Sequence, residues 1–230
     1  MISVVIIASN SERTIHECLD AIKNFEVILY LNNSTDRTKE IAQNFSNVKI
    51  IDGYFDGYGT TKNRAVSFAT NDWILVLDSD EIMTKELEEE LSNCNFDYQA
   101  YYVSRLNNYF GTWVKHGGLY PDYTVRLYNR NVAQFKERQV HESIDYNGKK
   151  GYLKNHFLHY CCDTIDFFIE KQNKYSTMNG KRNILKAFVS PYWTFLRMYF
   201  LRFGFLDGWT GFILAKLYSQ YTFWKYIKGK

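Results

Sequence analysis

Short apolar runs alternate with amphipathic stretches over roughly the first 95 residues of the chain. The runs have the length and the Val, Ile and Leu content of strands buried in a parallel sheet. The expected strands are Ile2–Ala8, Val27–Leu31, Val48–Ile51 and Trp73–Leu77. The expected helices are Glu12–Asn24, one opened by Ser34-Thr35-Asp36, Thr61–Ala69, and one from Thr84 to Asn93. This alternation predicts right-handed crossovers and a mainly parallel α/β sheet.

The pattern changes after this first part. From Ala100 to Tyr160 the apolar segments are shorter and more aromatic, and glycine and proline separate them, which predicts strands and loops. From Thr164 the spacing is helical again and very rich in aromatic residues. We therefore expect an α/β domain over residues 1–163, divided near residue 95, followed by a helical extension over residues 164–230.

Composition excludes several classes of protein. With 46% hydrophobic and 23% charged residues in 230, the chain is long and apolar enough to fold around a full core. A net charge of +3 is too small to indicate nucleic-acid binding. The four cysteines include no Cys-x-x-Cys pair, so we expect reduced thiols in a cytosolic compartment. We expect no signal peptide before Ile2–Ala8, and no apolar run reaches the ~20 residues of a membrane span.

The strand Trp73–Leu77 ends on two carboxylates one residue apart, Asp78 and Asp80. In open α/β sheets, ligands bind beyond the carboxyl ends of the strands. Two hard oxygen ligands at such a place suit Mg²⁺ or Mn²⁺, held largely by the diphosphate of a substrate. This prediction depends on the position of the pair at the end of a predicted strand, because the Asp-x-Asp spacing alone is common.

Polar clusters follow two other predicted strands. Ser9-Asn10-Ser11-Glu12 comes after the first, and Asn32-Asn33-Ser34-Thr35-Asp36 comes after the second. Gly57 and Gly59, followed by Lys62 and Arg64, add flexible backbone and two cations near a helix start, a suitable diphosphate environment. The alternative is that these residues only cap helices and form turns. Their joint occurrence beside the acidic pair favours a shared site.

These motifs resemble glycosyltransferase family 2 enzymes of the GT-A fold, which is Rossmann-like. More narrowly, the chain is similar to lipopolysaccharide core β-1,4-glucosyltransferases of the WaaE/KdtX type. The general matches are Ser3-Val-Val-Ile-Ile with Asn10 and Glu12, Ser34-Thr-Asp36-Arg-Thr, Lys62-Asn63, and Asp72-Trp73 through Asp80-Glu81. The narrower matches are His116-Gly-Gly-Leu-Tyr-Pro-Asp122-Tyr, Arg126-Leu-Tyr, Val140-His-Glu142, Lys171 to Tyr175-Ser176, and Leu201-Arg-Phe-Gly-Phe-Leu-Asp207-Gly.

The resemblance implies inverting transfer of a sugar from a nucleotide donor, UDP-glucose, to a hydroxyl of a lipid-linked saccharide. Residues 1–95 would hold the nucleotide sugar and 96–163 the acceptor. The implied donor-binding residues are Ser9, Asn10, Glu12, Asn32, Lys62, Arg64 and Asp78. The implied metal ligands are Asp78, Asp80 and His159, with a core role as the alternative for His159. Leu31 stands where the family usually has an aspartate for the uracil ring, so either Asn32 takes that contact or the nucleotide sits differently. Ser11 replaces a frequent glutamate.

An inverting transfer needs a carboxylate to take the proton of the acceptor hydroxyl. Glu142 is the first candidate and Asp122 the second, because both follow the acidic motif on the acceptor side. The alternatives are that Asp122 serves the turn after Pro121 and that Glu142 pairs with Arg138 or Arg126.

The tail from Phe188 to Lys228 interleaves aromatic and basic residues, and Asp207 is its one acidic residue. Such a composition suits the headgroup level of an anionic bilayer, so we expect a peripheral protein on the inner face of a bacterial inner membrane. The alternative is a helical pair that covers the core or a partner in a homodimer. Three other functions stay open. They are a glycosyltransferase of another surface glycan with a different donor, a sugar-phosphate nucleotidyltransferase, which the loop after the first strand disfavours, and a catalytically inactive membrane-bound module.

Overall fold

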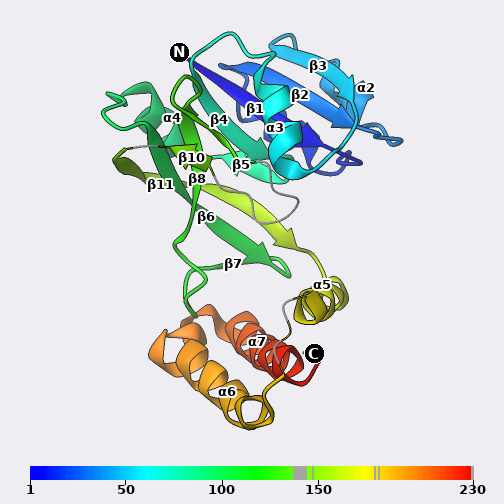
Figure 1. Ribbon diagram of the computed structural model, residues 1–230, viewed down its shortest axis with the longest axis vertical. Coiled ribbons are helices and arrows are strands. Elements are labelled where there is room, and N and C mark those ends of the chain that lie inside the picture. Colours follow the sequence, from blue (N-terminus) through cyan, green and yellow to red (C-terminus); the bar gives the residue numbers. More distant parts are fainter. Residues whose placement is uncertain (137–143, 147, 179, 181, 229–230) are drawn as a thin grey trace. The chain divides into compact units, whose positions relative to one another are not determined.

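The structure is a computed structural model that describes residues 1–136, 144–146, 148–178, 180 and 182–228. Nine of the described strands form one mixed sheet in the order β3-β2-β1-β4-β8-β6-β11-β5, with β7 paired to β6, while β9 and β10 form a hairpin (Figure 1). The strands are β1 Ile2–Ala8, β2 Glu26–Asn32, β3 Val48–Gly53, β4 Trp73–Asp78, β5 Glu81–Met83, β6 Ala100–Tyr109, β7 Thr112–Val114, β8 Asp122–Asn129, β9 Ala133–Phe135, β10 Ile144–Tyr146 and β11 Lys150–Cys162. The helices are α1 Ile15–Asp20, α2 Thr38–Ala42, α3 Tyr58–Val66, α4 Lys85–Ser92, α5 Ile165–Met178, α6 Ile184–Leu196, the π-helical η1 Arg197–Leu201, the 3₁₀ turn η2 Gly204–Asp207, and α7 Gly208–Ile227.

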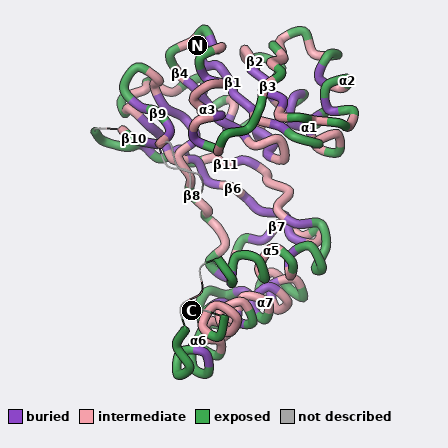
Figure 2. Tube along the Cα trace, turned by 45° about the vertical axis from the view of Figure 1, so that its right-hand side comes forward, coloured by how far each residue is buried: buried purple, intermediate pink, exposed green. Residues whose placement is uncertain are grey.

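Parallel pairing of β1 with β2 and β4 forms the centre of the sheet, with Val4 beside Val27 on one side and Leu75 on the other. Both faces of these strands are buried, which is why they appear as apolar runs rather than alternating patterns (Figure 2). Residues of α1 and α4 pack on one face, and residues of α3 and the β9–β10 hairpin pack on the other. The predicted α/β fold is confirmed in this part.

The helices differ from the prediction mainly at their starts. α1 begins at Ile15 rather than Glu12, because the backbone N–H groups of Ser11 and Glu12 donate to side chains of the next loop. α3 begins three residues before Thr61, after Gly57, whose φ of 111° suits glycine. The Thr84 cap of α4 is confirmed, since its hydroxyl accepts a hydrogen bond from the Leu87 N–H at 3.2 Å.

The chain divides into two compact units. The first comprises Met1–Arg105 and Tyr123–Leu158, and the second comprises Leu106–Asp122 and His159–Lys230. Strands β6 and β11 contribute residues to both units, so the division predicted at residue 163 stays a prediction.

The second unit contains the helices α5 to α7 and a small core of its own, which includes Tyr109, Phe168 and Leu214. Two motifs far apart in the sequence meet in it. The Asp207 carboxylate accepts hydrogen bonds from the His116 N–H at 2.8 Å and from the His116 imidazole Nδ1 at 2.8 Å. No helix in the described part of the chain has the length and apolar character needed to cross a membrane, and no disulfide joins the four cysteines.

Candidate active site

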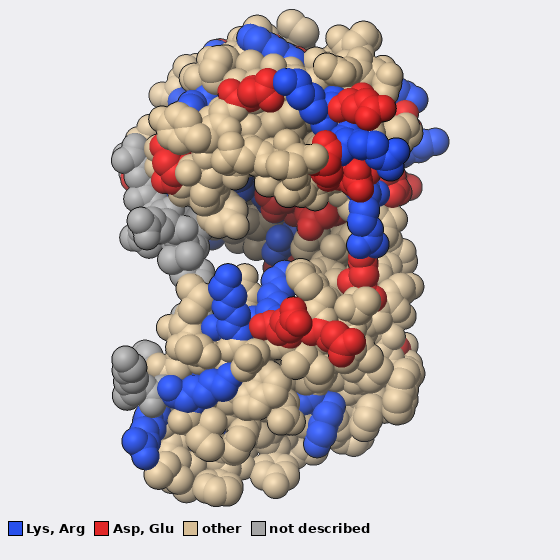
Figure 3. Space-filling model, turned by 90° about the vertical axis from the view of Figure 1, so that its right-hand side faces the viewer, with Lys and Arg blue, Asp and Glu red and all other residues tan. Residues whose placement is uncertain are grey.

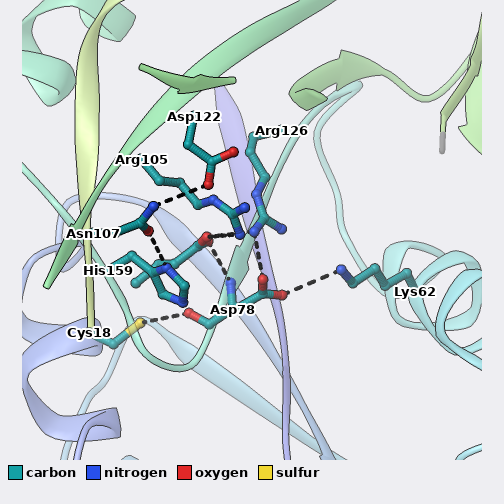
Figure 4. Close-up of polar contacts among 9 residues, drawn as sticks. Cys18, Lys62, Asp78, Arg105, Asn107, Asp122, Arg126 and His159 are labelled. Atoms are coloured by element: carbon teal, nitrogen blue, oxygen red, sulfur yellow. Dashed lines mark hydrogen bonds and ion pairs between the residues drawn. The ribbon is translucent and has the colours of Figure 1, made fainter. Parts of the chain in front are cut away.

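The candidate site is built around the carboxylate of Asp78 at the end of β4 (Figure 4). Arg126 on β8 donates from Nη2 to Asp78 Oδ2 at 2.6 Å, and Lys62 Nζ on α3 lies 3.4 Å from Oδ1. Burial raises the pKa of the Asp78 carboxyl, but the charges of Arg126 and Lys62 outweigh it and hold that pKa well below its usual range. The Asp78 carboxylate is therefore ionised, with both oxygens beside cationic groups.

Glu81 completes this cluster from inside the sheet. It is fully buried, and its Oε1 accepts a second hydrogen bond from Arg126 Nη2 at 2.5 Å. Its Oε2 accepts the backbone N–H of Asp78 at 3.0 Å, and Arg105 Nη1 lies 3.7 Å from Oε1. Arg126 thus bridges the strand-end acid and a buried acid, which fixes the direction of the Asp78 side chain.

Sequence reasoning missed Glu81 and Arg126 as members of the site. Both occur in the motifs quoted for the family resemblance, yet they were given no role there. A usable signal was present, because a glutamate next to two aspartates at a strand end needs a cation if it is buried. The alternative pairing of Arg126 with Glu142 concerns a residue outside the described part of the chain, whereas the described contacts of Arg126 go to Asp78 and Glu81.

The loops after β1 and β2 are joined by side-chain hydrogen bonds. Asn10 Oδ1 accepts the Thr35 N–H at 2.8 Å, and Glu12 Oε2 accepts the Arg37 N–H at 3.1 Å. Ser11 Oγ lies 2.8 Å from the Ser79 hydroxyl, within the Asp78–Asp80 turn. The predicted meeting of these loops at one sheet edge is therefore observed. Asn10 and Glu12 hold the loops in place, while Ser9 is an exposed residue of the same turn.

Lys62 and Arg64 lie on the same helix but have different surroundings. Lys62 is buried beside Asp78. Arg64 pairs with Asp56, donates to the Tyr30 hydroxyl at 3.2 Å, and stacks 4.2 Å from the Tyr54 ring centroid. At the end of β2, the buried Oδ1 of Asn32 has no hydrogen-bond partner among the described residues, so it is available to a ligand's donor group.

Asp122 and His159, predicted for different roles, are connected in the second unit through Asn107. The Asn107 amide donates to Asp122 Oδ2 at 3.3 Å, and its Oδ1 lies 2.7 Å from His159 Nδ1 (Figure 4). Asn107 was not identified from the sequence. Glu142, the first candidate for the base, lies outside the described residues.

No group of three or more His, Cys, Asp or Glu side chains in the described ranges is arranged to hold a metal ion. At diphosphate sites, one or two carboxylates and the substrate's phosphates supply the ligands of Mg²⁺ or Mn²⁺. Asp80, the second predicted carboxylate, directly follows Asp78 and Ser79. Its charge, with those of Glu81 and Asp78, adds to burial in raising the pKa of the Cys18 thiol.

The family model for glycosyl transferase family 2 matches residues 3–215. The chain belongs to this family. An uncharacterized glycosyltransferase of Rickettsia typhi is 30% identical over 99% of this chain and 86% of its own length. The lipopolysaccharide core biosynthesis glycosyltransferase LpsC of Rhizobium meliloti is 27% identical over 96% of this chain and 89% of its own. The family 2 chain is therefore a nucleotide-sugar-dependent glycosyltransferase of an inverting family, which sets aside the nucleotidyltransferase alternative.

Two solved structures share the fold of this family 2 chain. S. aureus TarS 1–349 in complex with UDP-GlcNAc has a TM-score of 0.54 at 17% identity, covering 93% of this chain and 79% of that one. The mannosyltransferase PcManGT from Pyrobaculum calidifontis, in complex with GDP-Man and Mn²⁺, has a TM-score of 0.59 at 11% identity, covering 97% and 85%. The predicted GT-A-like fold is confirmed.

Proposed function

We propose that this glycosyltransferase transfers glucose from UDP-glucose, with inversion, to a hydroxyl of a lipid-linked saccharide of the lipopolysaccharide inner core. The observation that carries the proposal is the Asp78–Arg126–Lys62 cluster at the end of β4 in a family 2 chain. Similarity to LpsC supports the acceptor class, and the UDP-GlcNAc complex of TarS supports a UDP-sugar donor.

Each residue of the cluster has a distinct task in this proposal. Both oxygens of Asp78 contact cationic side chains, so Asp80 and the donor diphosphate would supply most of the ligands of a divalent cation. When bound, that cation neutralises charge on the departing diphosphate. Lys62 and Arg126 add positive charge at the same place, and Asn32 offers its buried Oδ1 to the nucleotide base. His159 is kept as a further ligand candidate, and Arg64 supports the donor site through Tyr30 and Tyr54.

A carboxylate on the acceptor side completes the chemistry. In an inverting displacement it takes the proton of the attacking hydroxyl while the sugar is transferred. We propose Glu142 for this task, with Asp122 as the second candidate. Asp122 has a neighbour suited to positioning it, since Asn107 donates to its carboxylate.

The exposed side chains of the tail support the proposal that the protein acts at a membrane surface. Side chains of α6, η1, η2 and α7 include many exposed large apolar residues, among them Leu185 at 75% and Trp209 at 74% exposure. Lysine and arginine accompany them in the sequence from Phe188 to Lys228, and Figure 3 shows both basic and acidic side chains on one face of the molecule. Asp207, the one acidic residue from Phe188 to Lys228, is hydrogen-bonded to His116. We therefore propose peripheral attachment to the anionic inner face of a bacterial inner membrane, with a homodimer as the competing explanation.

The proposed function is tested by measuring nucleotide release from UDP-glucose, UDP-galactose, UDP-GlcNAc and GDP-mannose, with and without Mn²⁺. We expect UDP-glucose to be preferred and Asp80→Asn to lose most metal-dependent donor binding. The control Asp72→Asn changes an exposed acid before β4 and should behave as wild type. Preference for another donor would overturn the sugar assignment. Full metal-dependent activity in Asp80→Asn would overturn the metal assignment, and no donor binding at all would indicate an inactive module.

A further inference from the structure

A cavity of about 260 Å³ lies in the first unit beside the candidate active site. Tyr102, Tyr123, Tyr146 and Thr124 form part of its wall with polar groups, and Phe135 and Arg126 are buried residues that line it. Pockets that hold drug-sized ligands are ~300–1,000 Å³. This cavity is smaller, so it suits a single sugar ring better than a whole nucleotide sugar.

A row of aromatic rings extends from the cavity across strands β8, β6 and β11. The rings of Tyr102 and Tyr152 are stacked with centroids 5.0 Å apart, and Tyr123 meets Tyr152 edge-on at 5.1 Å. Lys150 Nζ lies 4.5 Å from the Tyr102 centroid. Tyr123 and Tyr152 remain 41% and 52% exposed. Adjacent exposed rings on a sheet contribute little to the core, so their grouping indicates a binding surface.

Two walls of the cavity contact the residues around Asp78. Arg126 lines the cavity and donates to Asp78 Oδ2 at 2.6 Å. The Phe135 ring lies 5.3 Å from Lys62 Nζ, which is the other cation beside Asp78. A ligand in the cavity would therefore sit one side chain away from the strand-end acid. The loops after β1 and β2 do not line the cavity, which separates it from the network that contains Asn10 and Glu12.

We propose that this cavity and its tyrosine row bind a pyranose ring of the acceptor saccharide. The C–H face of a pyranose is apolar and packs on aromatic rings, whereas its hydroxyls at the edge need hydrogen-bond partners. Tyr102, Tyr146 and Thr124 supply hydroxyls at the cavity, and Tyr123 supplies an exposed ring. This inference rests on the proposed function and adds to it the place where the acceptor binds.

The Tyr102 and Tyr146 hydroxyls are already positioned for this task. Burial and a hydrogen bond with Tyr102 raise the pKa of Tyr146, so the Tyr146 phenol stays neutral near neutral pH. A neutral phenol can both donate to and accept from a sugar hydroxyl. An anionic ligand would need a cation as its chief contact, but Arg126, which lines the cavity, pairs with Asp78 and Glu81, and Lys150 lies over the Tyr102 and Tyr152 rings.

The test uses methyl β-D-glucopyranoside, methyl β-D-galactopyranoside and methyl α-D-mannopyranoside as probes, with saturation-transfer NMR to detect binding. Tyr123→Ala and Tyr152→Ala should each weaken the affinity for the probes about 3- to 10-fold, the loss expected for one aromatic contact. Tyr123→Phe keeps the ring and should bind as wild type. Tyr98→Ala is the matched control, because Tyr98 is an exposed tyrosine of the same unit, 39% exposed and edge-on to Tyr101, but outside the cavity.

The donor is followed separately by thermal shift with UDP-glucose, whose binding should change less than twofold in all four variants. The inference is wrong if wild type binds none of the probes, if both alanine variants bind them unchanged, or if Tyr98→Ala loses as much. Failure of wild type to bind any nucleotide sugar would instead count against the proposed function. The two failures are distinguishable because the probes contain no nucleotide.

Discussion

Arg126 shows, at the scale of single residues, why the acidic motif has a defined geometry. One nitrogen of its guanidinium donates to both Asp78 and Glu81, and Lys62 approaches Asp78 from another element. Without these cations, acids at adjacent positions would repel one another and raise each other's pKa. The pairings keep Asp78 ionised and fix the direction of its side chain. Donor binding therefore does not need to order that side chain.

The general base is the residue-scale assignment that most needs an experiment. Glu142→Gln should leave donor affinity nearly unchanged and lower turnover about 10²–10⁴-fold, because a base acts on the acceptor proton and not on the nucleotide. Single-turnover transfer and donor titration measure the two effects separately. Asp122→Asn is the comparison and should cost less. If it abolishes transfer with donor binding intact while Glu142→Gln stays active, the two roles exchange.

A residue was harder to predict from the sequence when its contacts are with partners far along the chain. The sequence singled out Asp78, Asp80, Asn10 and Lys62 as candidates because each stands next to a strand end or helix start. Asn107 could not, since its partners Asp122 and His159 are 15 and 52 residues away. Arg126 is 48 residues from Asp78, and nothing in its local sequence specifies that contact.

At the scale of secondary-structure elements, the four parallel strands were predictable because burial on both faces produces continuous apolar runs. The helix starts were less predictable, because the Thr38 hydroxyl and the Asp36 carboxylate accept hydrogen bonds from backbone N–H groups just before α1, and these partners are distant in the sequence. Strand β5 was not predicted. It has three residues, Glu81–Met83, and the sheet order places it next to β11, about seventy residues later in the chain.

Strands β4, β5 and β8 are joined through Arg126, which gives a prediction about their stability. Arg126→Met removes the cation from the fully buried Glu81 and should destabilise the fold by about 3–5 kcal/mol, the usual cost of breaking a buried pair. Urea unfolding followed by circular dichroism measures this change. Arg37→Met is the control, because the Arg37–Glu12 pair is exposed and should contribute less than about 1 kcal/mol. Equal losses in the two variants would contradict the bridging role.

The same variant should change the response to acid. Asp78 has a folded-state pKa below its unfolded value of about 3.9, so its pairing stabilises the fold fully above that pH. That contribution is lost as the pH falls through the folded pKa. In Arg126→Met the pKa of Asp78 rises toward its unfolded value, so the stability of this variant should start lower but fall less steeply with acid than that of wild type. The free energy of unfolding measured at several acid pH values gives this slope, and an equally steep loss in both proteins would show that Arg126 does not set the ionisation of Asp78.

At the scale of the whole molecule, the chain combines an α/β sheet with a helical tail that the sequence composition already distinguished. The helical nature of the tail was predictable from its spacing. Its tertiary contacts were not, because they depend on pairs such as Asp207 with His116, 91 residues apart. Arg202 also has a local structural role, since its side chain lies across Gly118 at a distance that leaves no room for a Cβ atom. Charge reversal at Arg202 would therefore also remove this packing against Gly118, which makes it a poor test of membrane binding.

Lys186 and Lys216 are better positions for that test, because both are exposed residues of the tail helices. The double variant Lys186→Glu and Lys216→Glu should weaken binding to vesicles with anionic lipid by about 2–4 kcal/mol, at ~1 kcal/mol per basic residue with the reversal added. Vesicle sedimentation at low and high salt measures the change, and salt should weaken wild-type binding in the same direction. The control reverses two exposed lysines of the first unit, Lys23→Glu and Lys85→Glu, for the same change in net charge.

Trp209→Ser should also reduce binding, because the ring is 74% exposed and would lie among the headgroups. If all these variants sediment with vesicles like wild type while Trp209→Ser shifts a dimer to a monomer in solution, the apolar face of the tail is a subunit interface instead.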